Sequence, residues 1–415
     1  MVDTSDRFLP YGRQSVDEQD IQAVIAALKS DFLTTGPRVD AFEAALCEAT
    51  NARHAVACNS GTAALHLATA GLGFGPGDTL VVPAVTFAAS ANCAAYVGSD
   101  VSFADVDPDT GLMTAETLEA ALAGLPQSAK PRGVVVVHLN GQSADMPGIA
   151  GVARAHNLRI IEDACHAIGA DQRVGSGDGA ATNAKVGACT LSDAATFSFH
   201  PVKTIAAGEA GAMMTNDPDL ARRARAFRSH GITRDPEQFI NNQEAGLTTG
   251  ESANPWYYEM QMLGFNYRLS DVLCALGTSQ LSRLAQFVAQ RRALAAHYDT
   301  RLAGHEALVR PVGRVTGGNP AWHLYAVRID FEGLGTDRSA IMGALRARNV
   351  GTQVHYIPVP RLPYWSAKAN PGGRDGWPGA DRYYGRTLSL PLFVGMTTND
   401  VDRVVDTLLD LLSAR

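Results

Sequence analysis

An acid and an amine stand at the ends of two short apolar runs and carry the most distinctive chemistry of the chain. Glu162-Asp163 closes the run at residues 159–162, and Lys203 follows the run at residues 196–199. Burying a carboxylate at the end of a strand is unfavourable unless a cation meets it. A lysine in partly apolar surroundings can lose its proton and form a Schiff base with a carbonyl compound. Taken singly, such residues are more often helix caps or solvated side chains, so only their combination predicts a function.

Two further features supply groups that a phosphorylated aromatic ligand needs. Asn59-Ser60-Gly61-Thr62 follows an apolar run and opens a helical stretch, where free backbone N–H groups can bind a phosphate. Phe87 follows another apolar run and offers a flat face to a heteroaromatic ring. Ser198, five residues before Lys203, can add its hydroxyl to the phosphate site. A phosphate cradle, an aromatic platform, a buried acid and an amine are together the groups that pyridoxal phosphate requires.

These residues must be positioned by elements whose pattern alternates between strand and helix. We expect buried strands, apolar on both faces, over residues 54–58, 79–82, 133–138, 159–162, 196–199 and 212–215. We expect helices between them over residues 62–70, 87–96, 115–123 and 148–156. This alternation predicts an α/β fold, in which a mostly parallel sheet lies between helices. Ligands of such sheets bind beyond the carboxyl ends of the strands, where the acid and the amine lie.

The rest of the chain predicts a first helix, a long loop and a smaller domain. Ser15-Val16-Asp17-Glu18 has the spacing of a capping box and predicts a helix start. The polar residues 231–264 predict a long functional loop, and a long helical pattern then runs from Asn266 toward Tyr298. A strand over 322–329 and helices over 338–348 and 400–413 predict an α+β unit. We therefore expect a large domain over residues 1–275 and a small C-terminal domain over residues 276–415.

The composition favours a globular cytoplasmic enzyme and disfavours several other classes. The chain has 415 residues, 46% of them hydrophobic, and its formal net charge of −7 argues against nucleic acid or an anionic membrane as partner. No apolar run approaches a membrane span, and the charged N-terminus is unlike a signal peptide. Six scattered cysteines without a CxxC pair are typical of reduced core thiols and predict no metal site. No strand-linked GxGxxG, P-loop, HExxH or GxSxG motif is present, which disfavours the chemistry of those sites.

Four stretches of the sequence resemble the DegT/DnrJ/EryC1/StrS sugar aminotransferases. They are SGTAALHLA at residues 60–68, EDACHAIGA at 162–170, FSFHPVKTIAAGEAGAMMTND at 197–217 and GFNYRLSD at 264–271. The resemblance covers nearly the whole chain and implies a fold-type-I pyridoxal-phosphate enzyme that acts on a nucleotide-linked keto-sugar. Further stretches at residues 32–37, 228–237, 256–259 and 352–359 resemble the branch that makes UDP-4-amino-4,6-dideoxy-N-acetyl-β-L-altrosamine in pseudaminic acid biosynthesis.

The resemblance also implies roles for individual residues. Lys203 would be the Schiff-base lysine, and Asp163 would contact the pyridine nitrogen of the cofactor. The other cofactor-binding residues of this chain would be Gly61, Thr62, Phe87, His166 and Ser198. Asn266 would reach the phosphate of the neighbouring subunit's cofactor, which implies a homodimer with shared active sites. The positions that would contact the nucleotide sugar are Tyr11, Asp31, Phe32, Leu33, Thr34, Gln353, His355 and Tyr356.

The implied reaction moves an amino group from L-glutamate to C4 of a UDP-linked 4-keto-6-deoxy-N-acetylhexosamine. His166 stands where many relatives have glutamine, and the altrosamine branch often has histidine there. The run Ala206-Ala207-Gly208-Glu209-Ala210-Gly211 departs from the common TTGEGG and leaves any contact there open, while residues 174–183 look longer than usual and receive no role.

Two alternatives to this reaction stay open. One is an aminotransferase for another nucleotide 4-keto sugar, of the bacillosamine, legionaminic acid or perosamine type. The other, from a different class, is a non-catalytic protein that binds pyridoxal phosphate and regulates or scaffolds. A related dehydratase branch has histidine in place of the lysine, so Lys203 disfavours it.

Overall fold

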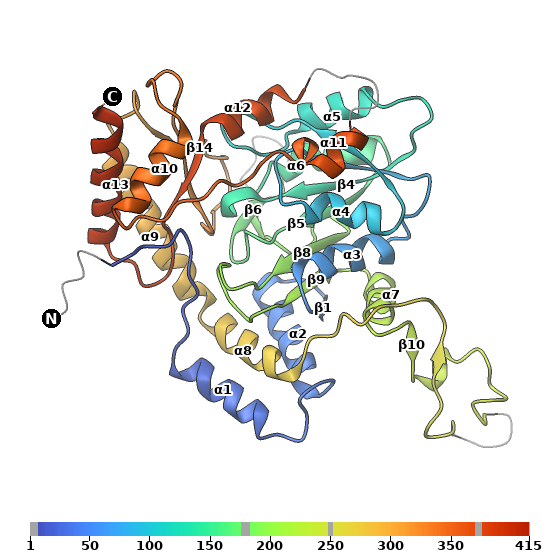
Figure 1. Cartoon of the computed structure of the whole chain (residues 1–415). Coiled ribbons are helices and arrows are strands. Elements are labelled where there is room, and N and C mark those ends of the chain that lie inside the picture. The colour runs from blue at the N-terminus through green and yellow to red at the C-terminus, as the bar shows by residue number, and fades with distance from the viewer. Residues whose placement is uncertain (1–6, 176–182, 248–251, 370–375, 415) are drawn as a thin grey trace.

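The computed structural model describes residues 7–175, 183–247, 252–369 and 376–414 and is built around a seven-stranded sheet (Figure 1). The strand order is β1-β9-β8-β5-β4-β2-β3. The strands are β1 (His54–Cys58), β2 (Thr79–Pro83), β3 (Asp100–Ala104), β4 (Pro131–Val137), β5 (Arg159–Asp163), β8 (Ala194–Ser198) and β9 (Gly211–Thr215). Strand β9 runs antiparallel to both of its neighbours, and the other pairs of adjacent strands are parallel. The predicted α/β fold with a mostly parallel sheet is confirmed.

Alternate residues of the strands point into two different hydrophobic cores, which explains why the runs are apolar on both faces. In β1, Val56 and Cys58 join one core cluster while Ala55 and Ala57 join another. The first cluster includes side chains from α3 (Gly61–Gly71), α4 (Ala89–Tyr96), α5 (Ala115–Ala123), α6 (Met146–Ala155) and α7 (Pro218–Arg228). The second cluster includes side chains from α2 (Pro37–Thr50), α8 (Asp271–Ser282) and α9 (Leu284–Leu302).

The register of the parallel strands brings the predicted reactive residues to one edge of the sheet. Asp163 ends β5 and lies opposite Val137 of β4 on one side and Thr196 of β8 on the other. The chain leaves β8 at Ser198 and reaches Lys203 five residues later. Helix α3 starts directly after β1, with Ser60 as its N-cap. The carboxyl ends of the strands therefore surround a common space, as expected for this kind of sheet.

Three local expectations differ from the structure. Helix α1 (Glu18–Leu28) is capped by Asp17 rather than Ser15, because the Asp17 and Asp20 side chains accept each other's backbone N–H. The pattern from Asn266 toward Tyr298 forms two helices, α8 and α9, which break at Arg283 instead of continuing. Strand β3 was not expected, because it is an edge strand with its first three residues partly exposed and gives no clear apolar run.

The C-terminal part of the chain forms a smaller antiparallel sheet with its own core. Its strands are β12 (Arg310–Pro311), β13 (Tyr325–Arg328) and β14 (Thr387–Leu390), and its helices include α10 (Arg338–Ala347) and α13 (Thr398–Ser413). Leu9 from the N-terminal segment belongs to this core and exchanges backbone hydrogen bonds with residues 349 and 351.

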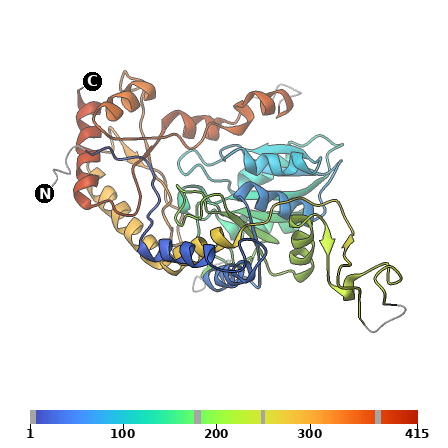
Figure 2. The same ribbon diagram turned by 60° about the horizontal axis from the view of Figure 1, so that its bottom comes forward.

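The two parts of the chain exchange segments. Helices α11 (Pro363–Ala369) and α12 (Pro378–Arg386) extend from the C-terminal part across the large sheet, as Figure 2 shows. Trp365 and Tyr383 from this segment belong to the core of the large sheet. A division at residues 275 and 276 therefore stays a prediction, since both cores draw on residues from each side of it.

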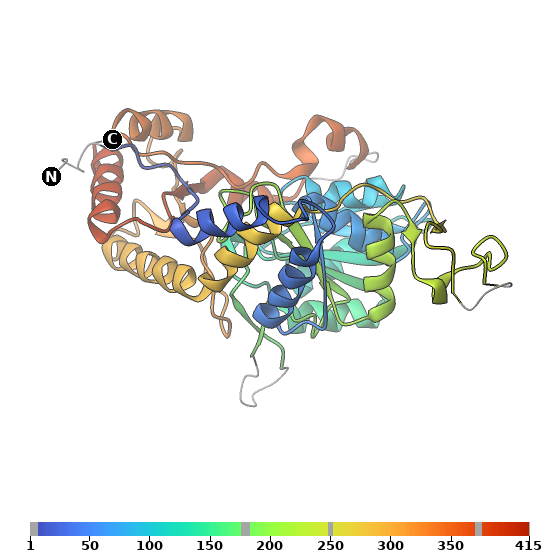
Figure 3. The ribbon, with the colours of Figure 1, turned by 90° about the horizontal axis from the view of Figure 1, so that it is seen from below.

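Two segments lie at the outside of this arrangement. The expected long loop at 231–264 contains the short hairpin of β10 (Ile232–Thr233) and β11 (Glu259–Met260), and it projects as an arm (Figures 1 and 3). The expected insertion at 174–183 falls mostly outside the described residues, between β6 (Asp171–Arg173) and β7 (Asn183–Lys185). Helix α1 packs along α8 on the underside of the molecule (Figure 3). Within the described parts of the chain, none of the helices combines the length and apolar character that a membrane span needs.

Candidate active site

The acid and the amine line the same cavity, which has a volume of about 710 Å³ and lies at the carboxyl ends of the strands. The lining comes from the end of β5, the loop after β8, the N-terminus of α3 and residues 353–357 of the C-terminal part. Among the sequence-predicted site residues, those that line it are Tyr11, Gly61, Thr62, Phe87, Asp163, His166, Ser198, Lys203, Gln353, His355 and Tyr356. Residues that are far apart in the sequence therefore meet in one space.

Asp163 is held in one orientation at the floor of the cavity. Only 6% of the residue is exposed, because it is the last residue of a central strand. The Ser90 hydroxyl of α4 donates to Oδ2 at 2.6 Å, and the backbone N–H of Cys165 donates to Oδ1 at 3.2 Å. Ser90 itself lies 2.7 Å from the Thr86 hydroxyl. Each carboxylate oxygen therefore has a protein donor that fixes the orientation of the side chain.

The neighbouring acid, Glu162, points to the other side of the strand and does not line the cavity. It is fully buried, with Oε2 at 2.8 Å from Nε2 of His138 and Oε1 accepting from the Ser192 hydroxyl. Nδ1 of His138 accepts from the backbone N–H of Ala144 at 3.2 Å, so the ring donates from Nε2 to Glu162. Of the two adjacent carboxylates, only Asp163 is available to a ligand.

The amine of Lys203 lies in a partly buried position beside Asp163. Burial lowers its pKa, and the neighbouring Cys165 and Asp163 oppose that shift without cancelling it. A lowered pKa raises the fraction of neutral amine, which is the form that attacks a carbonyl carbon. The environment of this lysine therefore suits nucleophilic chemistry.

The N-terminus of α3 provides a cradle of a size that only glycine permits. A Cβ on Gly61 would lie 2.8 Å from Cβ of Ser198 and 3.1 Å from Sγ of Cys165. The backbone N–H groups of Gly61 and Thr62 occupy the first two positions of the helix, where no acceptor is available within the helix. With the Ser198 hydroxyl beside them, they fit a phosphate group.

Aromatic and imidazole rings form the opposite wall. Phe87 is 59% exposed, and its ring centroid lies 5.9 Å from that of Tyr356. The Tyr356 hydroxyl is 3.1 Å from Nε2 of His166, and Nδ1 of His355 is 2.8 Å from the Ser389 hydroxyl. An exposed aromatic face on an otherwise enclosed wall fits the flat ring of a cofactor.

The titratable groups of this wall stay neutral near pH 7. Burial and then the positive charge of Lys203 lower the pKa of His166 well below its ordinary value and that of His355 to about 3. Burial, followed by the negative charge of Asp163, raises the pKa of Tyr356. The wall therefore offers neutral hydrogen-bonding groups rather than charges.

The remaining predicted residues lie away from this cavity. Asn266 is exposed on a segment that pairs with Ser229. The predicted stretch Asp31, Phe32, Leu33 and Thr34 is in the loop between α1 and α2, where Leu33 accepts a backbone hydrogen bond from Asp271 and Thr34 forms a bridge with Ser270. The structure does not bring these five residues to Lys203 of the same chain.

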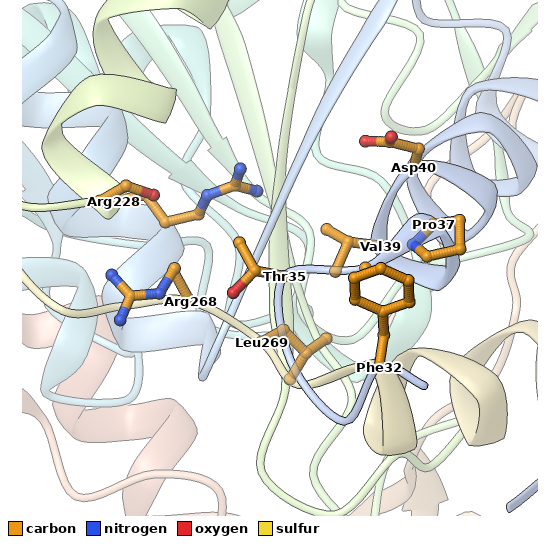
Figure 4. A pocket seen from close by; sticks show the side chains of 10 residues that line it. Phe32, Thr35, Pro37, Val39, Asp40, Arg228, Arg268 and Leu269 are labelled. Atoms are coloured by element: carbon orange, nitrogen blue, oxygen red, sulfur yellow. The ribbon is translucent and has the colours of Figure 1, made fainter. Parts of the chain in front are cut away.

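Phe32 instead lines a second, smaller pocket of about 350 Å³. Figure 4 shows the guanidinium groups of Arg228 and Arg268 on one side of this pocket and Phe32 and Pro37 on the other. The pocket has no lysine and no histidine in its lining, so it lacks a group of the kind that Lys203 supplies to the larger cavity.

Several lining residues were not predicted from the sequence. They are Thr86, Cys165, His200, Glu209 and His323, among others. Cys165, His200 and Glu209 lie inside the motifs quoted above, so their positions beside Asp163 and Lys203 in the sequence could have indicated them. His323 follows no motif, and only its place at the start of an expected strand marks it.

The departures from the family pattern after Lys203 lie in the core. Ala206, Ala207 and Ala210 are buried and do not line the cavity, and the backbone N–H of Ala207 donates to Phe199 at 2.8 Å. The retained Gly211 packs so closely that a Cβ would lie 2.3 Å from the backbone of Ser60. The lost hydroxyls therefore change core packing and not the surface of the cavity.

The fold and this cavity define an aminotransferase of fold type I that depends on pyridoxal 5′-phosphate. The chain belongs to the DegT/DnrJ/EryC1/StrS aminotransferase family, which matches residues 14–409. The cradle at Gly61, the acid at Asp163 and the amine at Lys203 provide the donor set that this cofactor needs.

Individual relatives support the same class. The chain is 36% identical to the spore coat polysaccharide biosynthesis protein SpsC of Bacillus subtilis. The match extends over 416 residues and covers 99% of each of the two chains. A similar solved structure is that of PseC from Helicobacter pylori, an aminotransferase involved in the biosynthesis of pseudaminic acid. Its TM-score with this chain is 0.84 at 25% sequence identity, and the match covers 99% of this chain and 100% of PseC. The putative sugar aminotransferase Spr1654 of Streptococcus pneumoniae has the same fold, with a TM-score of 0.82 at 24% sequence identity. The match covers 98% of this chain and 99% of Spr1654, which was solved in pyridoxal phosphate and pyridoxamine phosphate forms.

Proposed function

We propose that this sugar aminotransferase moves the amino group of L-glutamate to C4 of a UDP-linked 4-keto-6-deoxy-N-acetylhexosamine and makes UDP-4-amino-4,6-dideoxy-N-acetyl-β-L-altrosamine. The observation that carries the proposal is the meeting of Lys203 and Asp163 in one cavity beside the N-terminus of α3. The likeness to PseC and the histidine at position 166 support this sugar over others of the family.

In the proposed mechanism, Lys203 binds the cofactor and later moves protons. Bound pyridoxal phosphate supplies a conjugated ring that accepts the electron pair left when a C–H bond next to the amine breaks. The amine of Lys203 would take the proton from the α-carbon of glutamate. In the second half of the reaction the same amine delivers a proton to C4 of the sugar, which fixes the new stereocentre.

The other residues orient the reactants in this mechanism. Asp163, held by Ser90 and the backbone of Cys165, keeps a proton on the pyridine nitrogen. Gly61, Thr62 and Ser198 would hold the phosphate, Phe87 would lie against the ring, and His166 would contact the phenolic oxygen. Tyr11 from the N-terminal segment and Gln353, His355 and Tyr356 from the C-terminal part line the cavity and would contact the nucleotide sugar.

We also propose that the active unit is a homodimer in the cytoplasm. Asn266 and the stretch at residues 31–34 lie outside the cavity of their own chain, so they can take their proposed roles only in the cavity of a second copy. The second pocket, with its two arginines, would then lie at the surface that the two copies share. The six free cysteines agree with a reducing compartment.

A second candidate is a 4-aminotransferase for another nucleotide 4-keto sugar of the bacillosamine, legionaminic acid or perosamine type. The 36% identity to SpsC, a polysaccharide biosynthesis protein, favours keeping it. A non-catalytic role has less support, because a binding protein needs neither the amine nor the acid in the same cavity.

Product analysis tests the choice of sugar. The purified protein is incubated with glutamate and UDP-linked 4-keto sugars of the L-arabino and D-xylo series, and the amino sugars are identified. We expect turnover of the L-arabino substrate to exceed that of the D-xylo substrate. Preference for the D-xylo series would favour the second candidate, and a yellow colour that survives excess glutamate would favour the non-catalytic role.

A further inference from the structure

His323 lies in the wall of the cavity against His166, although no motif of the sequence singles it out. Its ring centroid is 4.4 Å from that of His166, with the rings tilted by 49°. The two residues are only 3% and 6% exposed. In the proposed function His166 would contact the phenolic oxygen of the cofactor, and His323 packs directly against its ring.

The backbone of His323 is fixed from three directions. Its N–H donates to the carbonyl of Asn140 at 3.0 Å, and its own carbonyl accepts from Nη1 of Arg291 at 3.1 Å. Gly141 approaches so closely that a Cβ there would lie 2.7 Å from the backbone nitrogen of His323 and 2.1 Å from the carbonyl oxygen of Ala321. The ring of His323 therefore has little freedom to move away from His166.

The buried side chain of Arg291 holds the backbone at His323 through hydrogen bonds. It is 1% exposed, and its guanidinium donates to the backbone carbonyls of Trp322, His323 and Leu392 rather than to a carboxylate. A buried cation held only by carbonyl groups is unfavourable unless it organises the backbone around it. Here it joins α9 to the segment that carries His323.

Both imidazoles are neutral, so each has one N–H and one acceptor nitrogen. Burial is the main reason that the pKa of His323 is well below its ordinary value, and the groups that face it add to the effect: His166, Lys203, Arg291 and His355. Nδ1 of His166 and Nδ1 of His323 are both buried, and neither has a hydrogen-bond partner among the described residues. Buried ring nitrogens without a protein partner are uncommon and indicate a place that receives a ligand group.

We propose that His323 is a positioning residue whose packed ring fixes the ring plane of His166 for its contact with the cofactor. The hydroxyl of Tyr356 is the one protein group within hydrogen-bond distance of the His166 ring in the described parts of the chain, and a single bond does not prevent the ring from turning. The packed ring of His323 prevents that rotation. This inference rests on the proposed function, because it assigns a purpose to His166 that only the bound cofactor gives it.

A double-mutant cycle in the holoenzyme tests the inference. The variants are His323→Ala, which removes the packed ring, His166→Gln, and the two together, with His305→Ala at an exposed histidine as the control. For His323→Ala we expect kcat to fall about tenfold, as when a positioning contact is lost, while KM for the sugar stays nearly constant. His323→Phe, which keeps a ring against His166, should retain kcat within about twofold. The pH at which the visible absorbance of the bound cofactor changes should shift by about half a unit, a roughly threefold change in a protonation equilibrium.

The cycle separates an action through His166 from a general effect on folding. In the His166→Gln background, His323→Ala should change kcat and the absorbance titration by less than about twofold, because the two residues act as one unit. Equal effects in both backgrounds, an absorbance titration that does not move, or a His323→Phe variant as impaired as His323→Ala would overturn the inference. His323→Val, tested in the same way, replaces the alanine variant if that one does not fold.

The response of the wild-type cofactor absorbance to glutamate distinguishes a failure of the proposed function from a failure of the inference about His323. A wild-type protein whose cofactor absorbance does not respond to glutamate contradicts the proposed function, and the inference about His323 falls with it. A wild-type protein with a normal response but additive variants contradicts the inference alone.

Discussion

The two pockets of the molecule differ in how their residues are brought together. The larger cavity collects residues that follow strand ends, and the register of β4, β5 and β8 places them side by side. The smaller pocket is built from a loop at Phe32, the end of α7 at Arg228 and the segment at Arg268. The first holds an acid and an amine in one chain, whereas the second offers arginines and no nucleophile. The comparison separates a cavity that holds the acid and the amine from a pocket without a nucleophile, which in the proposed homodimer would lie at the contact between the copies.

Replacing Lys203 is the most direct test of whether the larger cavity, and not the smaller pocket, carries the catalytic amine. Lys203→Ala should lower turnover by about 10⁴-fold or more, because one amine both binds the cofactor and transfers the protons. The visible absorbance of the lysine-bound cofactor should disappear, which a spectrum of the purified variant measures. Turnover that persists in this variant would place the catalytic amine elsewhere and remove the distinction between the two pockets.

The adjacent acids allow a matched test within the larger cavity. Asp163→Ala should lower kcat by about 10²- to 10³-fold while cofactor still binds, since an unprotonated pyridine nitrogen is a poor electron acceptor. Glu162→Gln is the control one residue away. It should leave kcat of the folded protein within about twofold but lower stability by roughly 1–3 kcal/mol, because His138 and Ser192 each donate to their own oxygen of Glu162 and a glutamine offers only one acceptor oxygen. Rate assays and denaturant midpoints measure the two effects, and similar kcat losses in both variants would contradict the assignment of Asp163.

Mixed dimers sharpen the interpretation of the second pocket. Asn266→Ala should weaken cofactor retention about tenfold, the size of one hydrogen bond to a charged group. If the site is shared, mixing Lys203→Ala subunits with Asn266→Ala subunits creates one cavity with both an intact lysine and an intact asparagine from its partner. Cofactor titration of the mixture should then recover a tight class of sites. Without such recovery, Asn266 acts in its own chain or not at all.

The same contrast explains how much could be predicted from the sequence. Residues at the ends of β5 and β8 were found because buried strands are apolar on both faces and their carboxyl ends share an edge. The edge strand β3 was not predicted, because its exposed residues leave no continuous apolar run. His323 escaped for another reason: its place against His166 depends on contacts with Asn140, Gly141 and Arg291, which are far from it in the sequence. Contacts of that kind leave no local pattern in the sequence.

The imidazole wall gives the larger cavity an acid sensitivity that the smaller pocket does not share. His355 is 6% exposed, and burial followed by the charge of Lys203 lowers its pKa to about 3. Because the unfolded chain binds this proton with an ordinary pKa near 6.5, the unfolded state gains more protons as the pH falls below that value. Stability should therefore be complete above about pH 6.5 and decrease toward pH 3. From pH 6.5 to 5.5 this one residue should account for about 1 kcal/mol of lost stability.

Urea midpoints of the wild type and of His355→Phe measure the difference, with His305→Phe as the exposed control. A pH dependence that is identical in all three proteins would show that His355 is protonated equally well in the folded chain, and that the wall of the cavity is open to water.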